Sequence, residues 1–326
     1  MEQRKSVLSL EEIYRAASAM REKIKAIKVS YQYTQVPTEA EKANRPTVSP
    51  PRDQRRTFAM RMPLRSAEVE GLEDGNPIHQ RYVFDGKHKV FDRDNDGYPN
   101  LARMEDASGW IGAGEQFQPY AIMMDIRFAG DLFAGWPFPE VLSLPHLPYF
   151  VRDHLEKIGD RWCHVIEHPA EKFDLIWVDS ENPSIMVKRE MSFQHEGKLF
   201  PSTRISFGSF RDFGDGVCLP EYIERQDFPS PADNVEPGTL LSNATCEVSE
   251  IKLNDDVTQD DFTFCVRKGE KFGFFSVGLE IEDGDTPIFR AWEATVRERR
   301  IPMPFDQPAN EDIKLIIAER SPAFFS

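Results

Sequence analysis

The chain has 326 residues and a formal net charge of −15, with 40 lysines and arginines against 55 aspartates and glutamates. Because a nucleic-acid backbone or an anionic membrane surface would on average repel so acidic a protein, the composition argues against both as partners. The length allows one large β domain or two ordinary domains. The sequence contains no run of about 18 apolar residues that could cross a membrane as a helix.

The first residues predict a helix. Ser9 and Glu12 have the spacing of a capping box, and Leu8 and Ile13 occupy the two positions of a hydrophobic staple. Apolar residues then recur at three- and four-residue steps, at Leu10, Ile13, Ala17, Met20 and Ile24. Because one apolar stripe of this kind has to pack on something, we expect the helix to cover a sheet.

Most of the chain from Ile27 to Asn254 has the pattern of short alternating strands. Ile27, Val29, Tyr31 and Tyr33 alternate with polar residues, which is the period of a half-buried strand. Further strands are expected at Phe58–Met62, in a pair meeting at Asp85-Gly86, in a hairpin with a Gly159-Asp160 turn, and at 173–179, 185–193, 205–207, 216–228 and 239–253. In the last of these strands the parity of the apolar residues changes, which predicts a bulge or bend near Ser249.

Three segments depart from this pattern. Residues 37–51 contain four prolines and few apolar residues, which predicts an exposed excursion between strands. Residues 106–148 combine Gly, Pro and large apolar side chains, and we expect them to pack as short helices and loops over one open face of the sheet. Beyond Lys268 the pattern thins into a Pro-rich tail, where residues 311–320 predict a short final helix.

One short motif has the spacing of a metal site. Asp92, Asp94 and Asp96, followed by Gly97, reproduce the first half of a calcium loop. The twelfth position of such a loop calls for a glutamate, but here it is Arg103. Since Asp and Gly also favour turns, we expect a solvated acidic turn between strands and keep the three carboxylates as a weak calcium candidate.

The remaining reactive residues do not form a catalytic constellation in the sequence. His164 and His168 would lie about 13 Å apart along a strand, too far for one metal ion to bridge. The four cysteines have no zinc-like spacing, so we expect buried free thiols, with a disulfide if the protein is exported. Neither a nucleophile elbow nor a phosphate loop is complete. We therefore expect a non-enzymatic protein without a cofactor.

Five stretches together resemble the bacterial lipoprotein-carrier family, the Lol-type outer-membrane lipoprotein-sorting proteins, and sigma-factor regulator domains of the same shape. They are the opening helix running into IKVSYQYTQ, the hairpin EKIGDRWCHVIEH, and the stretches LIWVDSENPSIMVKREMSF, GVCLPEYIE and VSEIKLNDDVTQDDFTF. They extend over residues 8–275. The insertion at 37–51, the 106–148 region and the tail after Phe275 depart from a minimal carrier and leave the cargo open.

The resemblance implies a mainly β (α+β) fold, a curved antiparallel half-barrel of about ten strands with an opening N-terminal helix, covering helices and an apolar cavity. We expect this domain in residues 1–275, and a Pro-rich C-terminal extension with the short final helix in residues 276–326. The implied function is non-catalytic binding of lipid or lipoprotein acyl chains by a monomer, with a membrane-associated protein as a further candidate partner. The place is the periplasm or cell envelope if an export signal precedes this chain, and the cytoplasm if Met1 is the true start.

Inward-facing side chains of the predicted strands are the candidate ligand-binding residues. Strand parity selects Val29, Tyr31, Tyr33, Phe58, Met60, Met62, Ile205 and Phe207. Aromatic and Met side chains suit irregular apolar ligands, although a curved sheet would bury the same residues without a ligand. The alternative function is therefore a protein-interaction or sensor domain on the same half-barrel, similar to the sigma-factor regulators, with a filled interior and no lipid transport.

Overall fold

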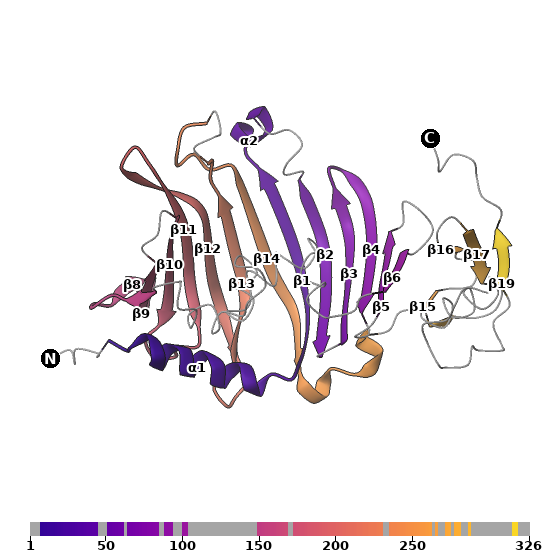
Figure 1. Cartoon of the computed structure of the whole chain (residues 1–326), viewed down its shortest axis with the longest axis horizontal. Coiled ribbons are helices and arrows are strands. Elements are labelled where there is room, and N and C mark those ends of the chain that lie inside the picture. Colours follow the sequence, from indigo (N-terminus) through magenta and orange to yellow (C-terminus); the bar gives the residue numbers. More distant parts are fainter. Residues whose placement is uncertain are drawn as a thin grey trace.

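The structure is a computed structural model, and it describes residues 7–44, 51–61, 64–84, 88–93, 100–103, 149–168, 172–230 and 235–262, followed by the short segments 265–266, 271–274, 277–281, 286–287 and 315–318 (Figure 1). The helical elements in these ranges are α1 (Leu10–Lys23), α2 (Glu39–Asn44) and the short turns η3 (Asn254–Asp256) and η4 (Gln259–Phe262).

The strands fall into two long runs and a set of short strands near the C-terminus. The first run is β1 (Ala26–Pro37), β2 (Arg52–Arg61), β3 (Leu64–Glu73), β4 (Asn76–Phe84), β5 (His88–Arg93) and β6 (Asn100–Arg103). The second run is β7 (Phe150–Val151), β8 (Glu156–Ile158), β9 (Arg161–His168), β10 (Lys172–Asp179), β11 (Met186–His195), β12 (Lys198–Asp212), β13 (Cys218–Asp227) and β14 (Ser242–Leu253). The short strands are β15 (Cys265–Val266), β16 (Lys271–Phe274), β17 (Val277–Ile281), β18 (Thr286–Pro287) and β19 (Leu315–Ala318).

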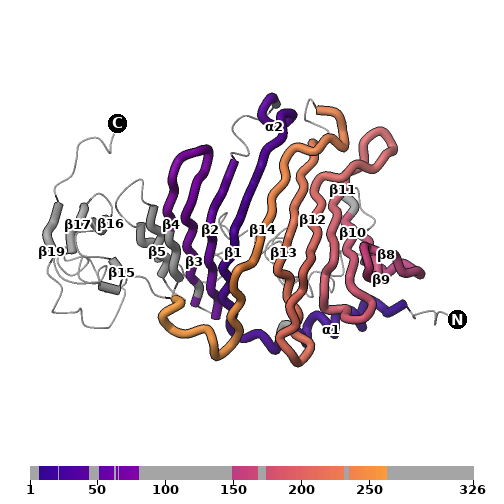
Figure 2. The backbone as a smooth tube through the Cα atoms, turned by 180° about the vertical axis from the view of Figure 1, so that it is seen from behind, coloured from indigo at the N-terminus to yellow at the C-terminus, as the bar shows by residue number. Residues whose placement is uncertain are grey.

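Both long runs belong to one antiparallel sheet of 14 strands. Its order is β6-β5-β4-β3-β2-β1-β14-β13-β12-β11-β10-β9-β7, with β8 paired to β9. Strands β1–β6 and β9–β14 each form a meander of consecutive neighbours, with β7 and β8 both paired to β9, and the two runs meet where β1 pairs with β14 in the middle of the sheet (Figure 1). Figure 2 shows the same wide, twisted and open sheet from behind.

The predicted fold class is confirmed, because the chain is mainly β and forms one open, curved antiparallel sheet with an opening helix. The sheet has 14 strands where about ten were expected. Strand β3 is one that the sequence pattern did not reveal. Its residues facing the same way as Phe58 are Ala67, Val69 and Gly71, which are too small to give a clear apolar alternation.

The predicted exposed excursion at 37–51 is wrong in part, because residues 39–44 form the helix α2. Thr38 caps this helix, since its Oγ1 accepts a hydrogen bond from Glu41 N–H at 3.4 Å and its carbonyl accepts one from Lys42 N–H at 3.1 Å. Glu41 is buried. The cap and the helix-forming residues behind it outweigh the prolines, which lie outside the helix.

The predicted final helix at 311–320 is wrong for the residues described there, because Leu315–Ala318 form the strand β19. This strand pairs with β17, which also pairs with β16. Two adjacent isoleucines, Ile316 and Ile317, favour a strand over a helix. The β16–β17 hairpin spans residue 275, and the division into 1–275 and 276–326 stays a prediction. The expected packing of residues 106–148 lies outside the described residues.

Both predicted hairpins are present. Ile158 pairs with Arg161 across Gly159-Asp160, and Gly159 has a φ of +60°, the left-handed conformation that such a two-residue turn requires. Strands β4 and β5 also pair, although Asp85 and Gly86 between them lie outside the described residues.

The predicted bulge lies at Ser249. Ser30 of β1 pairs with Glu250, whereas the next residue, Tyr31, pairs with Val248. Ser249 is therefore the extra residue, and its Oγ donates a hydrogen bond to the Ser30 carbonyl at 3.1 Å. The bulge keeps apolar residues of β14 on one face although their parity in the sequence changes.

Helix α1 begins at the predicted capping box. Ser9 N–H donates to Glu12 Oε2 at 2.7 Å, and Glu12 N–H donates to Ser9 Oγ at 3.3 Å. The helix lies across the ends of β9 to β13 (Figure 1). Its apolar stripe is buried against the sheet, as predicted. We call the side of the sheet that it covers the α1 face, and the other side the opposite face.

Asn254 joins the end of α1 to the start of β1. Its Oδ1 accepts hydrogen bonds from Lys25 N–H at 2.7 Å and Ala26 N–H at 3.3 Å, and its Nδ2 donates to the Lys23 carbonyl at 2.9 Å. Asn254 has a φ of +52°, a conformation that asparagine tolerates better than most residues. One side chain thus holds the corner between the helix and the sheet.

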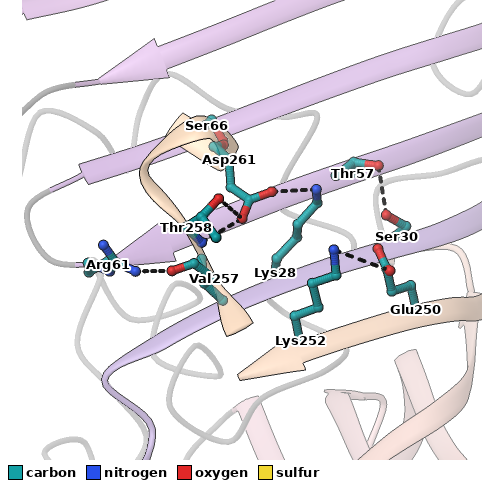
Figure 3. A network of polar contacts seen from close by, with 10 residues as sticks. All are labelled: Lys28, Ser30, Thr57, Arg61, Ser66, Glu250, Lys252, Val257, Thr258 and Asp261. Atoms are coloured by element: carbon teal, nitrogen blue, oxygen red, sulfur yellow. Dashed lines mark hydrogen bonds and ion pairs between the residues drawn. The ribbon is translucent and has the colours of Figure 1, made fainter. Parts of the chain in front are cut away.

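Residues 254–262, which we call the strap, cross to the opposite face after β14. Val257 and Phe262 pack there on Ala26 and Ala59. Figure 3 shows the polar contacts of the strap, in which Lys28 Nζ lies 2.6 Å from Asp261 Oδ1 and Arg61 and Ser66 donate to strap carbonyls. The end of the last long strand is therefore bound to the first three strands.

The substitution Asn254→Ala is expected to lower the free energy of unfolding by about 1–3 kcal/mol, because three backbone groups lose their partner and alanine tolerates a positive φ poorly. Asn254→Gly is the matched control, since it removes the same hydrogen bonds without the backbone strain. Urea denaturation of both variants measures the two effects separately. A cost below about 0.5 kcal/mol in both variants, the range of an ordinary surface change, would contradict this role.

Asp261 should make the strap sensitive to acid. Burial alone would raise the pKa of Asp261, but hydrogen bonds from Lys28 and Thr258 outweigh burial and hold its pKa below the ordinary value of 3.8. Because the folded-state pKa is the lower one, the stabilisation is complete above the unfolded-state pKa and is lost as the pH falls through the folded-state pKa. The difference in unfolding free energy between wild type and Asp261→Asn should be constant above about pH 5 and shrink below about pH 4. Urea denaturation over a pH series measures it, and a difference independent of pH would argue against a charge effect.

Candidate ligand-binding face

The α1 face carries one continuous apolar cluster, to which α1, β1–β3 and β9–β14 contribute. Six of the eight predicted ligand-binding residues are buried in it, with exposed fractions of 0–7%. They are Val29, Tyr31, Tyr33, Phe58, Ile205 and Phe207. Met60 is half-buried and packs against this cluster, and Met62 lies outside the described residues. Whether a ligand touches these side chains stays a prediction.

The six residues form two groups within one layer. Val29 of β1 pairs directly with Phe58 of β2, and Tyr31 and Tyr33 follow along β1 on the same face. Ile205 and Phe207 lie on β12, three strands from β1, which is about 14 Å at the usual spacing between strands. The intervening strands β13 and β14 contribute Ile223 and Cys246. A ligand that contacts both groups would have to be extended across the sheet.

The opposite face has two smaller apolar clusters. One contains Cys163, Val165, Trp177, Ile185 and Val187. The other lies under the strap. Because side chains alternate between the two faces of a strand, these clusters are separated from the α1 face by the sheet itself. The opposite face therefore supplies buried residues that can serve as controls for any effect assigned to the α1 face.

A buried ion pair interrupts the apolar cluster of the α1 face. Arg189 Nε and Nη2 donate to the two carboxylate oxygens of Asp174 at 2.9 and 2.7 Å, and Tyr149 OH donates to Asp174 Oδ2 at 2.9 Å. The side chains of Arg189 and Asp174 are 2% and 5% exposed. Burial opposes the charged form of Arg189, but the carboxylate outweighs it and raises the pKa of the guanidinium. Arg189 and Asp174 thus pair inside the core.

A second polar cluster lies on the α1 face toward the end of β1. Arg56 Nε donates to Gln54 Oε1 at 2.9 Å, and the Arg56 guanidinium lies 3.9 Å from the centre of the Tyr33 ring. Tyr33 OH donates to Gln35 Oε1 at 2.9 Å. Gln54 and Arg56 are 0% and 3% exposed. This end of the face is therefore buried but polar.

Two further arginines lie beside this cluster. Arg52 Nη2 is 3.4 Å from Glu73 Oε1, and Arg225 Nε donates to Asp227 Oδ1 at 2.9 Å. Sequence reasoning did not select these residues, because it followed apolar side chains only. The signal was present in strand parity, since Arg52, Gln54 and Arg56 share the parity of Phe58 in β2.

Burial shifts the pKa of several thiols and of one histidine in the described ranges. Cys163 and Cys246 are free and buried, as expected, whereas Cys218 is free but only half-buried, and burial raises the pKa of Cys163 and of Cys246 to about 12. His164 is buried, burial lowers its pKa, and its Nδ1 accepts a hydrogen bond from Leu8 N–H at 3.4 Å. Of the calcium candidates, Asp92 lies in β5, and Asp94 and Asp96 lie outside the described residues.

The described residues contain no group of three or more His, Cys, Asp or Glu side chains that could hold a metal ion. In the same part of the chain, no helix is both long enough and apolar enough to span a membrane.

The buried ion pair predicts that the stability cost of substituting Asp174 depends strongly on whether Arg189 is present. Asp174→Leu should cost about 3–5 kcal/mol of unfolding free energy, because Arg189 would lose the carboxylate that neutralises it in the core. The double variant with Arg189→Met should recover much of that loss, since two apolar side chains can pack together. Urea denaturation of the two single variants and the double variant tests this coupling. Costs that simply add would contradict it.

Comparisons with known proteins found matches among solved structures. No protein-family model matches the chain, and no curated protein matches it. A LolA superfamily protein from Nitrosomonas europaea matches 78% of this chain and 98% of its own at 13% identity, with a TM-score of 0.41. An outer membrane lipoprotein-sorting protein domain from Vibrio parahaemolyticus matches 78% and 97% at 9% identity, with a TM-score of 0.42. The MucA/MucB complex of Pseudomonas aeruginosa matches 74% and 99% at 9% identity, with a TM-score of 0.25.

Proposed function

We propose that this protein binds lipid or lipoprotein acyl chains, without catalysis, and serves in sorting or carrying lipoproteins in the cell envelope. The observation that carries the proposal is the continuous apolar layer of the α1 face, built by nine strands of one open sheet and covered by a helix. An open sheet with an apolar face can admit a long apolar chain between itself and its covering elements. The resemblance of the sequence motifs to lipoprotein carriers agrees with this use.

The energetics suit such a task. Burial of apolar surface is worth about 25 cal/mol per Å², so one long acyl chain gains several kcal/mol on leaving water. Phe58 and Met60, on neighbouring positions of one face of β2, offer an aromatic and a flexible side chain to an irregular ligand. Binding of this kind requires shape and apolar area, and no reacting group.

The setting that fits this function is the periplasm or cell envelope. A lipoprotein or another amphiphile would be the main partner of a monomer, with a membrane-associated protein that delivers or receives the cargo. The acidic net charge of −15 disfavours lasting adhesion to an anionic membrane surface, which suits a protein that releases its cargo and leaves.

A protein-interaction or sensor domain on the same fold is the second candidate. Large apolar side chains are exposed on the opposite face, namely Val36 of β1 at 57%, Leu72 of β3 at 45% and Leu199 of β12 at 53%. These side chains could contact a protein partner, and the residues of the α1 face would then be an ordinary core.

Native mass spectrometry of the gently purified protein, with lipid extraction from the same sample, tests the proposal first. A co-purifying lipid or acylated peptide is the expected result. A bare protein that also fails to take up a fluorescent fatty acid would overturn acyl-chain binding and favour the interaction domain.

Two matched substitutions locate the binding face. Phe58→Leu on the α1 face should weaken fatty-acid binding about fourfold, because about 0.8 kcal/mol is lost per methylene equivalent removed from contact. Phe262→Leu makes the same change at a buried residue of the opposite face and should leave the affinity unchanged. Fluorescence titration measures both variants. Equal affinities of the two variants would argue against the α1 face as the binding site.

A further inference from the structure

Arg52, Arg56 and Arg225, which we call the arginine group, share the α1 face near the end of β1. In the sheet register, Arg52 pairs with Gln35, Gln35 with Ala244, and Ala244 with Arg225. Two arginines therefore stand at the ends of one row that crosses four strands. The residues between them in the row are Gln35 and Ala244, which are both buried.

Arg52 has an unsatisfied donor. Its guanidinium lies 3.5 Å from Gln35 Oε1 and 3.4 Å from Glu73 Oε1, both long for hydrogen bonds. Its Nε is buried and has no hydrogen-bond partner in the described part of the chain. Since buried donors in native proteins are nearly always paired, this N–H is suited to an acceptor that comes from outside.

Three guanidinium groups act on Tyr33, and those of Arg52 and Arg225 also have the carboxylates of Glu73 and Asp227 beside them. Burial raises the pKa of the Tyr33 phenol, and the charges of Arg56, Arg52 and Arg225 act against that rise. Guanidinium groups bind carboxylates and phosphates strongly because their parallel N–H donors match two oxygens.

The arginine group is reached from solvent on one side and adjoins apolar surface on the other. The side chains of Arg52 and Arg225 are 24% and 32% exposed. Along β1 toward α1, the same face continues with Tyr31 and then Val29, which are buried in the apolar cluster. The face is thus polar at its open end and apolar under the helix, which is the polarity of a long-chain amphiphile.

We propose that the arginine group binds the acidic head group, a carboxylate or a phosphate, of an amphiphile whose apolar chain lies along the α1 face toward α1. This inference rests on the proposed function and adds the class of head group. Arg52 and Arg225 contact the head group. Arg56 is buried beside Gln54 and the Tyr33 ring, and its positive charge attracts the head group without contact.

The test compares ligands that share a chain and differ in the head group. Decanoate, decyl phosphate and decanol each displace N-phenylnaphthylamine, a neutral apolar fluorophore, from the full-length protein at neutral pH. For wild type, at least one of the two anions should displace the fluorophore at a concentration about tenfold lower than decanol, which corresponds to about 1.4 kcal/mol. The better of the two anions identifies the head group as a carboxylate or a phosphate.

Substitutions test whether the arginine group causes the preference for an anionic head group. The double substitution Arg52→Gln/Arg225→Gln should remove the preference for the anion over decanol. Arg204→Gln is the matched control, because Arg204 also lies in a β-strand, is 36% exposed and is paired with a carboxylate, but faces the opposite side of the sheet. It should keep the wild-type preference. If the double variant fails to fold, Arg52→Lys, which keeps the charge and loses the Nε donor, should reduce the preference.

The outcomes separate the two proposals. Equal displacement by all three ligands in wild type, or an anion preference that survives in the double variant, would overturn the head-group site and leave acyl-chain binding intact. Failure of the fluorophore and of every ligand to bind would overturn the proposed function and, with it, the site that rests on it.

Discussion

The pairing of β1 with β14 is the contact on which the rest of the structure depends. It joins two meanders that are otherwise separate, and each of its strands also carries one end of its meander. The bulge at Ser249 shifts the register of this pairing by one residue, so that Tyr31 and Val248 lie opposite each other on the same face. Without the extra residue, every side chain of β14 beyond it would point to the wrong face. The continuous layer of the α1 face therefore follows from one irregular residue in a central strand.

Helix α1 depends on the same junction. The chain turns from α1 into β1 at the residues that Asn254 binds, directly after the end of β14. The strap then attaches the following residues to β1, β2 and β3 through Lys28, Arg61 and Ser66. The position of the helix over the face and the joining of the two meanders are thus determined together, by contacts between residues more than 190 positions apart in the sequence.

The sequence predicted features with a clear local pattern well, and it predicted short elements with a weak pattern and pairings between distant strands poorly. The capping box, the alternation of β1, the Gly159-Asp160 turn and the parity change at Ser249 all have local chemical causes, and all are found in the structure. By contrast, β3 was missed because its inward residues are small. The helix α2 was missed because nearby prolines obscured a short capped segment, and β19 because its apolar residues fit either period. Pairing of distant strands, such as β1 with β14, has no local signal.

The candidate site shows the same limit. Parity selected Tyr31, Phe58 and Ile205 correctly as members of one buried face, because apolar alternation reports burial. It did not select Arg189 or Arg56, because charged residues are usually exposed. They are buried only where a partner offsets the cost of burial, and here that partner lies elsewhere in the sequence. Asp174 is such a partner, and it lies on β10, separated by 15 residues from Arg189. Only the register of the sheet shows that these charges meet.

Charge acts on two length scales in this molecule. At physiological ionic strength the field of an exposed charge fades over about 8 Å, so the net charge of −15 governs the approach to large surfaces, whereas a bound group responds to its nearest neighbours. An anionic bilayer would present many charges to the acidic exterior at once and be repelled. A single acidic amphiphile that enters beside Arg52 and Arg225 instead meets guanidinium donors at close range, among them the Arg52 Nε that has no partner in the described part of the chain. An acidic exterior with an arginine group at the open end of its apolar face would therefore favour one detached amphiphile over the membrane from which it came.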